Sequence, residues 1–245
     1  MSRATACSAA ADAPPNLLPR DGAAFLHSNA LPGPDADRLF EQLRQTIDWR
    51  QEVATVMGRR LPIPRLTAWH GTSGYVYSGI RMPPAPWTPA LLELREIAEA
   101  LAGQPFNSVL LNLYRDGRDS VSWHADNEPG LGKNPVIASI SIGAVRRFQL
   151  KHRRSGERVA VDLPHGSCLI MAGATQHHWL HQLPKTAQPV GPRINLTFRK
   201  MVRSAASIST RLARSSSSSS SPGMSRSFVA IALPPHFDLL RSKMR

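Results

Sequence analysis

The sequence predicts an α+β, mainly β fold, in which a sandwich or jelly roll of short strands is buttressed on one side by N-terminal helices. Helix-period apolar patterns are confined to the stretch before Gly103. From Phe106 onward, short apolar runs alternate with Gly, Pro, Asp and Ser turn residues. Two helices followed by many short strands are typical of such layered folds. A chain of 245 residues, 42% of them hydrophobic, is long enough for one domain with a sizeable core.

The first expected helix begins near Pro34, where Asp35 is a candidate capping residue. The second begins at Thr88-Pro89, a capping residue followed by the proline that suits the first helical position. Gly103 is placed to end it. The apolar faces comprise Leu39, Phe40, Leu43 and Ile47 in the first helix, and Leu91, Leu94, Ile97, Ala98 and Leu101 in the second.

The strands follow one another after the second helix. Turn residues such as Asp116-Gly117, Ser155-Gly156 and Pro164-His165-Gly166 separate them. The segments with strand character are 106–114, 120–124, 136–143, 146–152, 158–163, 166–172 and 193–199.

Composition also predicts the ends of the domain. Residues 1–20 are rich in Ala and Pro, and we expect them to be disordered or loosely attached. Seven consecutive serines, 215–221, mark residues 204–245 as a low-complexity basic tail that cannot bury a core. The folded domain is therefore expected over residues 21–203.

The chain is strongly basic, with a net charge of +13. The tail holds six Lys or Arg and one Asp, a net of +5, so residues 1–203 still carry +8. Such a surface attracts polyanions, and nucleic acid is the natural candidate. Charge alone favours this only modestly, because basic proteins have other reasons to be basic.

Two cysteines, Cys7 and Cys168, cannot form a disulfide framework, which fits a reducing compartment. No apolar stretch approaches a membrane span, and no secretory signal is seen. We therefore expect a cytoplasmic protein without membrane partners, and a monomer.

The candidate reaction centre begins at His124 and Asp126, which stand two residues apart. In a strand or strand end both side chains point to the same face. His181, at the end of the run His177-His178-Trp179-Leu180-His181, can supply a third ligand. Two histidines and one carboxylate on one side of a metal are the arrangement of non-haem Fe(II) oxygenases. A His-x-Asp pair alone is weak support.

The segment 192–199 alternates strictly, with Ile194, Leu196 and Phe198 on one face. Arg193, Asn195, Thr197 and Arg199 share the other face. The alternative is an ordinary amphipathic strand with its polar face in water. The two arginines are roughly 20 Å apart at the backbone. Leaning toward each other, they could grip both ends of a short dicarboxylate, because a guanidinium binds carboxylate bidentately and stays charged.

These motifs resemble those of the AlkB-type nucleic-acid dealkylating dioxygenases, and most closely their animal DNA-repair homologues. The likeness covers roughly residues 50–201, and the order and spacing of the motifs make it specific. The matching stretches are Asn112-Leu113-Tyr114-Arg115-Asp116-Gly117, His124-Ala125-Asp126-Asn127-Glu128, 137–143, 178–184 and 192–200.

The resemblance implies a double-stranded β-helix that binds Fe(II), 2-oxoglutarate and O₂. It implies oxidative demethylation of N-alkylated bases such as 1-methyladenine and 3-methylcytosine, with release of formaldehyde, succinate and CO₂. His124, Asp126 and His181 are then the iron ligands. His177 and His178, which could compete for the third position, are read as ordinary structural or solvent-exposed histidines.

For 2-oxoglutarate, the resemblance implies that Arg193 holds the far carboxylate and Arg199 the end next to the metal. Thr197, Asn112 and Tyr114 assist. Taken alone, Tyr114 at the end of an apolar strand is most often a core edge residue.

The implied substrate is alkylated DNA, single- or double-stranded, or RNA. A base processed in a closed site must leave its stack and be held by aromatic faces and polar groups. By resemblance, Tyr75, Tyr77 and Ser78 line the base pocket and Glu128 contacts the base. The alternative for Gly74 through Ser78 is a plain strand with surface tyrosines.

The DNA-contacting part is expected around a hairpin tip at Val56-Met57-Gly58. In double-strand-specific relatives an apolar residue at this tip separates the bases, and Met57 replaces an aromatic there. Arg59, Arg60 and Arg65 would meet phosphates. A shorter loop at 152–157, and Arg147 where an acidic residue is usual, leave strand preference open.

Three alternatives belong to other classes. A Zn²⁺ hydrolase with the same ligands would need neither O₂ nor 2-oxoglutarate, and it leaves Arg193 and Arg199 unexplained. A basic nucleic-acid-binding module with a relict site would bind but turn over nothing. An oxygenase could also act on RNA, on protein or on a small molecule.

Overall fold

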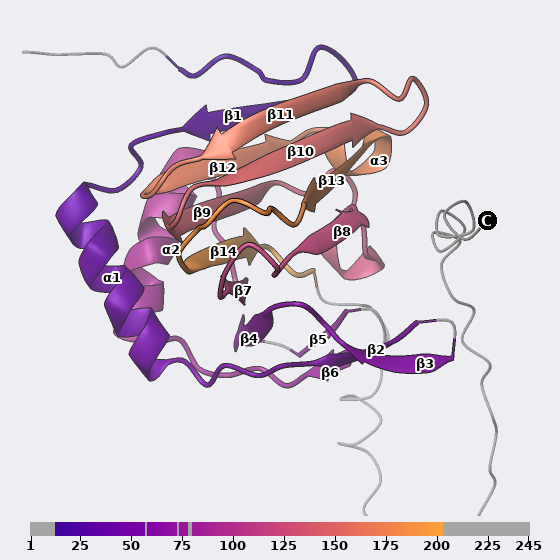
Figure 1. Ribbon diagram of the computed structural model, residues 1–245. Coiled ribbons are helices and arrows are strands. Elements are labelled where there is room, and N and C mark those ends of the chain that lie inside the picture. Colours follow the sequence, from indigo (N-terminus) through magenta and orange to yellow (C-terminus); the bar gives the residue numbers. More distant parts are fainter. Residues whose placement is uncertain (1–12, 57, 73, 78–79, 203–245) are drawn as a thin grey trace, which may run out of the picture. The chain divides into compact units, whose positions relative to one another are not determined.

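The computed structural model describes residues 13–202 except 57, 73 and 78–79, and it contains two main antiparallel sheets (Figure 1). The larger sheet has six strands. In spatial order these are β1 (Ala23–His27), β12 (Ser167–Ala172), β9 (Ile137–Gly143), β14 (Arg193–Arg199), β7 (Ser108–Tyr114) and β4 (Leu66–Gly71). The smaller sheet has the order β11 (Arg158–Leu163), β10 (Arg146–His152), β13 (Trp179–Leu183) and β8 (Val121–His124).

The seven strands expected after the second helix are all present, with their bounds shifted by two residues at most. They are distributed over both sheets, so successive segments of the chain cross from one layer to the other. This is the jelly-roll arrangement, and it confirms the expected double-stranded β-helix.

Two helices cover the larger sheet, α1 (Gly33–Thr46) and α2 (Pro89–Ala102), and both contact β9. Thr88 caps α2 by accepting a hydrogen bond from the Leu91 backbone N–H, and Gly103 ends the helix in the left-handed conformation, as expected. The expected cap of α1 is wrong. Pro32 occupies the N-cap position and Asp35 lies in the first turn, where its charge favours the helix dipole.

Several short strands were not expected from the periodicity of the sequence, although the resemblance implied a hairpin with its tip at Val56-Met57-Gly58. The strands β1, β4 and β13 complete the two sheets, and two hairpins add β2 (Val53–Val56) with β3 (Arg59–Pro62), and β5 (Tyr75–Tyr77) with β6 (Ile80–Met82). In Figure 1 both hairpins extend on the side of β4, away from α1 and α2. Single turns of helix also occur, at η1 (Pro129–Leu131) and α3 (Thr175–His178). These segments are too short to show a clear period in sequence.

The expected disorder of residues 1–20 does not hold for the described part of that segment. The Asn16 side-chain carbonyl accepts hydrogen bonds from the backbone N–H groups of Leu18 and Ala24, at 3.1 and 2.8 Å. Leu18 is buried, and the Trp179 indole N–H donates to the Arg20 carbonyl at 3.0 Å. This anchoring places the chain for β1.

The core has two parts. One lies where α1 and α2 pack on the larger sheet, and it includes Leu39, Leu43, Leu91 and Leu94. The other contains apolar residues of both sheets, among them Leu150, Leu163 and Trp179. Among the residues described, no helix is long and apolar enough to cross a membrane.

A glycine at the end of β9 tests this packing. Gly143 has a φ of 93°, and a Cβ added there would lie 2.5 Å from the Pro192 carbonyl oxygen and 2.8 Å from the Phe40 ring. Gly156 has a φ of 74° with open space around it. We predict that Gly143→Ala lowers the free energy of unfolding by about 3 kcal/mol, against about 1 kcal/mol for Gly156→Ala. Urea denaturation measures both, and equal losses would contradict the packing described.

Candidate active site

Strand pairing brings the two expected histidines together. His124 ends β8 and His181 lies directly opposite it on β13, with ring centroids 4.2 Å apart. Asp126 follows β8, and its carboxylate joins them, so that one ligand atom from each residue lies within 4.8 Å of the other two. The three side chains form a compact group with the composition of a metal site.

Neighbouring groups orient these side chains. The His124 Nδ1 lies 2.8 Å from the Ser122 carbonyl oxygen, which can only accept, so Nδ1 carries the proton and Nε2 the lone pair. The Asp126 backbone N–H donates to the Gln176 side-chain carbonyl at 2.9 Å. Phe148 stacks on the His181 ring at 5.4 Å between centroids. Each ligand is therefore held before any ion binds.

Burial and charge set the protonation states that a metal requires. Burial lowers the pKa of His181 to about 3, and it also lowers the pKa of His124. Burial opposes ionisation of Asp126, but Arg199 and the two histidines outweigh it and lower its pKa to about 2. Two neutral imidazoles and a carboxylate are the forms that bind a divalent cation. Asp126 Oδ1 is buried with no hydrogen-bond partner among the described residues, so an oxygen ligand is available.

The strand β14 is buried on both faces. Ile194, Leu196 and Phe198 belong to the core beneath the helices, as the alternation predicted. The opposite face does not point to water, so the ordinary amphipathic strand is wrong. Instead, Arg193, Asn195, Thr197 and Arg199 line a cavity together with His124, Asp126 and His181.

Each arginine of β14 has a defined partner. The Arg199 Nη2 lies 2.9 Å from Asp126 Oδ2, in an ion pair whose two side chains are 3% and 2% exposed. Arg193 donates to the Ser141 hydroxyl at 2.8 Å, and its guanidinium lies 5.4 Å from the centre of the Tyr114 ring. Arg199 is therefore the arginine beside the metal ligands, and Arg193 stands at the Tyr114 side of the same cavity. The division of roles between the two arginines in binding 2-oxoglutarate stays a prediction.

Arg65 departs from its predicted role as a phosphate contact. It is only 5% exposed, and its Nε donates to the Asn112 side-chain carbonyl at 2.7 Å. A second nitrogen donates to the Ser120 carbonyl at 3.3 Å. Because these bonds turn the guanidinium inward, Arg65 lines the cavity and cannot meet the backbone of a nucleic acid bound outside.

The charge of the cavity lining is unbalanced. Three guanidiniums, Arg65, Arg193 and Arg199, face one carboxylate, Asp126, so the lining carries 3 − 1 = +2. Burial lowers the pKa of Arg193 to about 10, which shows the cost of holding this charge away from water. A bound dianion would compensate the lining.

The other predicted residues fall into two groups. Asn112, Tyr114 and Thr197 line the cavity as expected. Glu128 is half-buried beside η1 and is not among the lining residues.

The predicted base pocket and hairpin tip are only partly described. Tyr75 and Tyr77 lie on β5, and Ser78 is outside the described residues. The hairpin predicted around Val56-Met57-Gly58 exists: Val56 pairs with Arg59, and Met57 itself is outside the described residues. Arg59 and Arg60 are exposed on β3.

Sequence reasoning missed several residues that shape the cavity. Across the β9–β14 pair, the Asn195 side-chain amide donates to the Ser139 hydroxyl, and the Arg193 guanidinium donates to the Ser141 hydroxyl. Alternation in Ile137–Gly143 could have found them, because both serines fall on the face opposite Ile140 and Ile142. Arg146 is also buried, and it donates to the carbonyls of Asp119 and Pro184 at 3.0 and 2.7 Å. The alternation of β10 could have distinguished it from the exposed Arg147, because Arg146 shares its face with Phe148 and Leu150. Arg147 lies on the other face and pairs with Asp162 at 2.8 Å.

The pKa of His181 predicts how the metal-free protein responds to acid. In the unfolded chain the His181 imidazole has its ordinary pKa of 6.5, whereas in the folded protein it stays neutral down to about pH 3. The free energy of unfolding should therefore fall as the pH falls through this window, by up to about 1.4 kcal/mol per pH unit for one proton. Urea unfolding between pH 6.5 and 4.5, in a chelating buffer, measures it. His181→Gln should show a shallower slope and His177→Ala an unchanged one. An unchanged slope in His181→Gln would refute the assignment.

Comparison with known proteins agrees with this geometry. The chain is similar to the Alpha-ketoglutarate-dependent dioxygenase alkB homolog 3 of Homo sapiens and of Bos taurus, each 46% identical over 175 residues that span 67% of this chain and 61% of the relative. It is 38% identical to the DNA oxidative demethylase ALKBH2 of Homo sapiens over 181 residues, which span 69% of each. The matched region thus spans about three fifths of the length of the alkB homolog 3 proteins.

Structural comparison adds the fold. A solved structure of OsALKBH1 matches 72% of this chain and 97% of its own, with a TM-score of 0.52 and 17% sequence identity. At that identity the likeness supports the fold alone. The family model of the 2OG-Fe(II) oxygenase superfamily matches residues 23–199, which include every lining residue of the cavity. The chain belongs to the 2OG-Fe(II) oxygenase superfamily.

Proposed function

We propose that this protein is an Fe(II)- and 2-oxoglutarate-dependent dioxygenase that removes N-linked methyl groups from bases of DNA, such as 1-methyladenine and 3-methylcytosine. One observation carries the oxygenase part. A cluster of two histidines and a carboxylate shares a buried cavity with a net positive lining of three arginines and one aspartate. The metal ligands suit Fe(II), and the excess charge suits a dicarboxylate.

The residues divide the work of holding the cofactors. His124, Asp126 and His181 would bind Fe(II), which together with 2-oxoglutarate and O₂ supplies the oxidation that releases the methyl group as formaldehyde, with succinate and CO₂. Arg193 would bind the far carboxylate of 2-oxoglutarate. Arg199 would bind the end beside the metal while it holds Asp126 in place.

Other lining residues complete the cofactor pocket. Asn112, Tyr114 and Thr197 would contact 2-oxoglutarate from β7 and β14. Phe148, Met171 and Leu183 provide apolar walls that keep water from the reacting atoms. A Zn²⁺ hydrolase is less well supported, because it has no use for the two arginines of β14.

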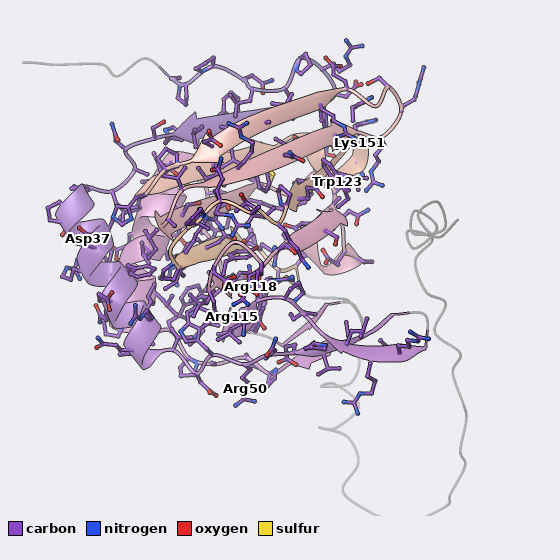
Figure 2. The ribbon with its side chains drawn as sticks, in the orientation of Figure 1. Asp37, Arg50, Arg115, Arg118, Trp123 and Lys151 are labelled. Atoms are coloured by element: carbon purple, nitrogen blue, oxygen red, sulfur yellow. The ribbon has the colours of Figure 1, made fainter. Side chains whose placement is uncertain are left out.

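The nucleic-acid substrate is supported by the relatives and by the surface. The name DNA oxidative demethylase is given to a relative that shares 38% of its residues over the matched region. Arg59 and Arg60 are exposed on the hairpin β2–β3. A groove beside this hairpin has three cations, Arg115, Arg118 and Lys185, and two carboxylates, Asp116 and Asp119, in its lining, and Figure 2 shows Arg115 and Arg118 on that side of the sheets. Arg115 pairs with Asp119 at 2.8 Å and Arg118 with Asp116 at 2.7 Å, so the groove keeps a net charge of one positive unit from Lys185.

We propose that this region meets the phosphates, and that Met57 at the hairpin tip separates the bases of a duplex. Tyr75, Tyr77, Ser78 and Glu128 would receive the extruded base. Val56, Gly58 and Arg59 belong to the same DNA contact. The proposed contacts to DNA are supported by the resemblance and by the exposed cations, and not by any contact within the cavity.

We further propose that residues 21–203 form the catalytic domain and residues 204–245 a tail outside it, in line with the family match over 23–199. We also propose a reducing compartment such as the cytoplasm, because the chain has two cysteines and Cys168 is a free, buried thiol. We propose a monomer acting on alkylated DNA, with RNA as the second substrate class.

The proposal is tested by measuring succinate and formaldehyde release with Fe(II), ascorbate and 2-oxoglutarate on oligonucleotides that contain 1-methyladenine. Both products should appear in step with loss of the methyl group, and the His181→Ala variant should release neither. Single-stranded DNA, duplex DNA and RNA are compared in parallel. Met57→Ala should slow the duplex reaction more than the single-strand reaction.

Each result has a definite reading. Succinate without demethylation of any oligonucleotide would overturn the substrate and keep the oxygenase. Turnover without O₂ would favour the hydrolase. Binding of DNA without either product, in the iron-loaded protein, would leave only a binding module.

A further inference from the structure

A second group of metal-binding side chains lies outside the cavity. It consists of Asp21, His152 and His178, which come from the segment before β1, the end of β10 and the end of α3. One ligand atom from each lies within 4.8 Å of the other two. None of the three lines the cavity described above.

The central member is a buried histidine whose outer nitrogen points into the group. The His152 side chain is 5% exposed, and its Nε2 lies 3.1 Å from Asp21 Oδ2. That contact lacks hydrogen-bond geometry, and Nε2 has no hydrogen-bond partner among the described residues. Two ligands that each lie about 2.0–2.1 Å from a tetrahedral Zn²⁺ are roughly 3.3 Å apart. The Nε2–Oδ2 separation is therefore close to that of two ligands sharing one ion.

The inner nitrogen of His152 fixes the tautomer of the ring in the ion-free protein. Nδ1 accepts a hydrogen bond from the Ser155 backbone N–H at 3.1 Å, so the ring proton lies on Nε2, which faces Asp21. Binding of an ion at Nε2 requires this proton to move to Nδ1, and the Ser155 backbone N–H then loses its acceptor. The Ser155 hydroxyl, 2.9 Å from Nδ1, is placed to accept the proton in that state.

The backbone around all three residues is fixed. The Trp179 indole N–H donates to the Arg20 carbonyl at 3.0 Å, and the Ala23 N–H donates to the Thr175 hydroxyl at 2.9 Å, so Asp21 is anchored on both sides. The Arg153 N–H donates to the His178 carbonyl at 2.8 Å. His178 itself is exposed, and one of its ring nitrogens already lies within 4.8 Å of the ligand atoms of Asp21 and His152.

One of the cations that flank this group in sequence is paired with a carboxylate. Arg20, the residue next to Asp21, is paired with Glu157 at 3.1 Å, which offsets its positive charge. Two imidazoles and one carboxylate suit Zn²⁺, and a water molecule would complete the tetrahedron. We propose that Asp21, His152 and His178 form a second metal site that binds Zn²⁺ and ties the segment before β1 to the smaller sheet. This site is independent of the proposed reaction.

The test counts Zn²⁺ bound to the full chain by equilibrium dialysis and elemental analysis, since the catalytic ligands also bind this ion. The wild-type protein should bind one equivalent more than His178→Ala, and likewise one more than His181→Ala. The double variant should lack both. His177→Ala is the matched control, because it removes the adjacent exposed histidine, and it should bind as the wild type does.

A second readout separates a built site from surface binding. In the His181→Ala background, Zn²⁺ should raise the midpoint of thermal unfolding, because the ion joins two segments of the fold. The rise should vanish in His178→Ala and Asp21→Asn, and persist in His177→Ala. Equal zinc content in His178→Ala and His177→Ala, or no loss of the thermal shift in Asp21→Asn, would overturn the proposal.

Discussion

The buried ion pair between Arg199 and Asp126 is the interaction on which the site depends. It joins β14, the last strand in sequence and an interior strand of the larger sheet, to the segment that follows β8 of the smaller sheet. The two charged groups are 2.9 Å apart, and both side chains are nearly excluded from water. Attraction at this depth is strong, yet removing two charges from water is expensive. Loss of one partner would leave the other buried and unpaired, which typically costs about 3–5 kcal/mol.

The pair serves chemistry as well as packing. Holding Asp126 beside the two histidines keeps it ionised despite its burial, which is the form that a metal ligand must have. The same pairing uses one carboxylate oxygen and leaves Oδ1 for an ion. Arg193, six residues away on the same face of β14, lies beside the Ser141 hydroxyl and the Tyr114 side chain, and no carboxylate pairs with it among the described residues. Arg193 therefore keeps its positive charge available at the Tyr114 side of the cavity, where the far carboxylate of 2-oxoglutarate would bind.

The fold makes this arrangement possible because β14 is central in its sheet. Its neighbours β9 and β7 satisfy the backbone, so one face can be wholly apolar and the other wholly polar without contact with water. Serines of β9 and an asparagine of β7 supply hydrogen bonds across this polar face. The cost of burying such a face is offset by the helices on the opposite side.

Much of this could be predicted from the sequence, and the remainder has identifiable causes. The metal ligands were predictable because short motifs mark them, at His124 and Asp126 and again at His181. Strand β14 was predictable because its apolar and polar residues alternate strictly. Arg65 was misplaced because an arginine before a strand reads as exposed until its partner Asn112, 47 residues away, is known. Strand β1 was missed because the residues that hold it in place, in β12 and at Thr175, are distant in sequence.

The cluster at His152 was missed for the same kind of reason. Its members, Asp21, His152 and His178, are separated by more than 20 residues each, and no local spacing connects them. Sequence reasoning had assigned His178 to an ordinary role. Only the pairing of β10 with β13 brings the two histidines together.

We infer that the metal ligands and the arginines of β14 form one site that binds Fe(II) and 2-oxoglutarate together. Anaerobic calorimetric titration with 2-oxoglutarate, with and without Fe(II), measures this coupling. We predict that Fe(II) tightens binding of 2-oxoglutarate at least tenfold, and that Arg199→Ala loses this gain while the exposed control Lys200→Ala keeps it. Equal affinity with and without Fe(II), or an unchanged affinity in Arg199→Ala, would show that the two groups do not share a site.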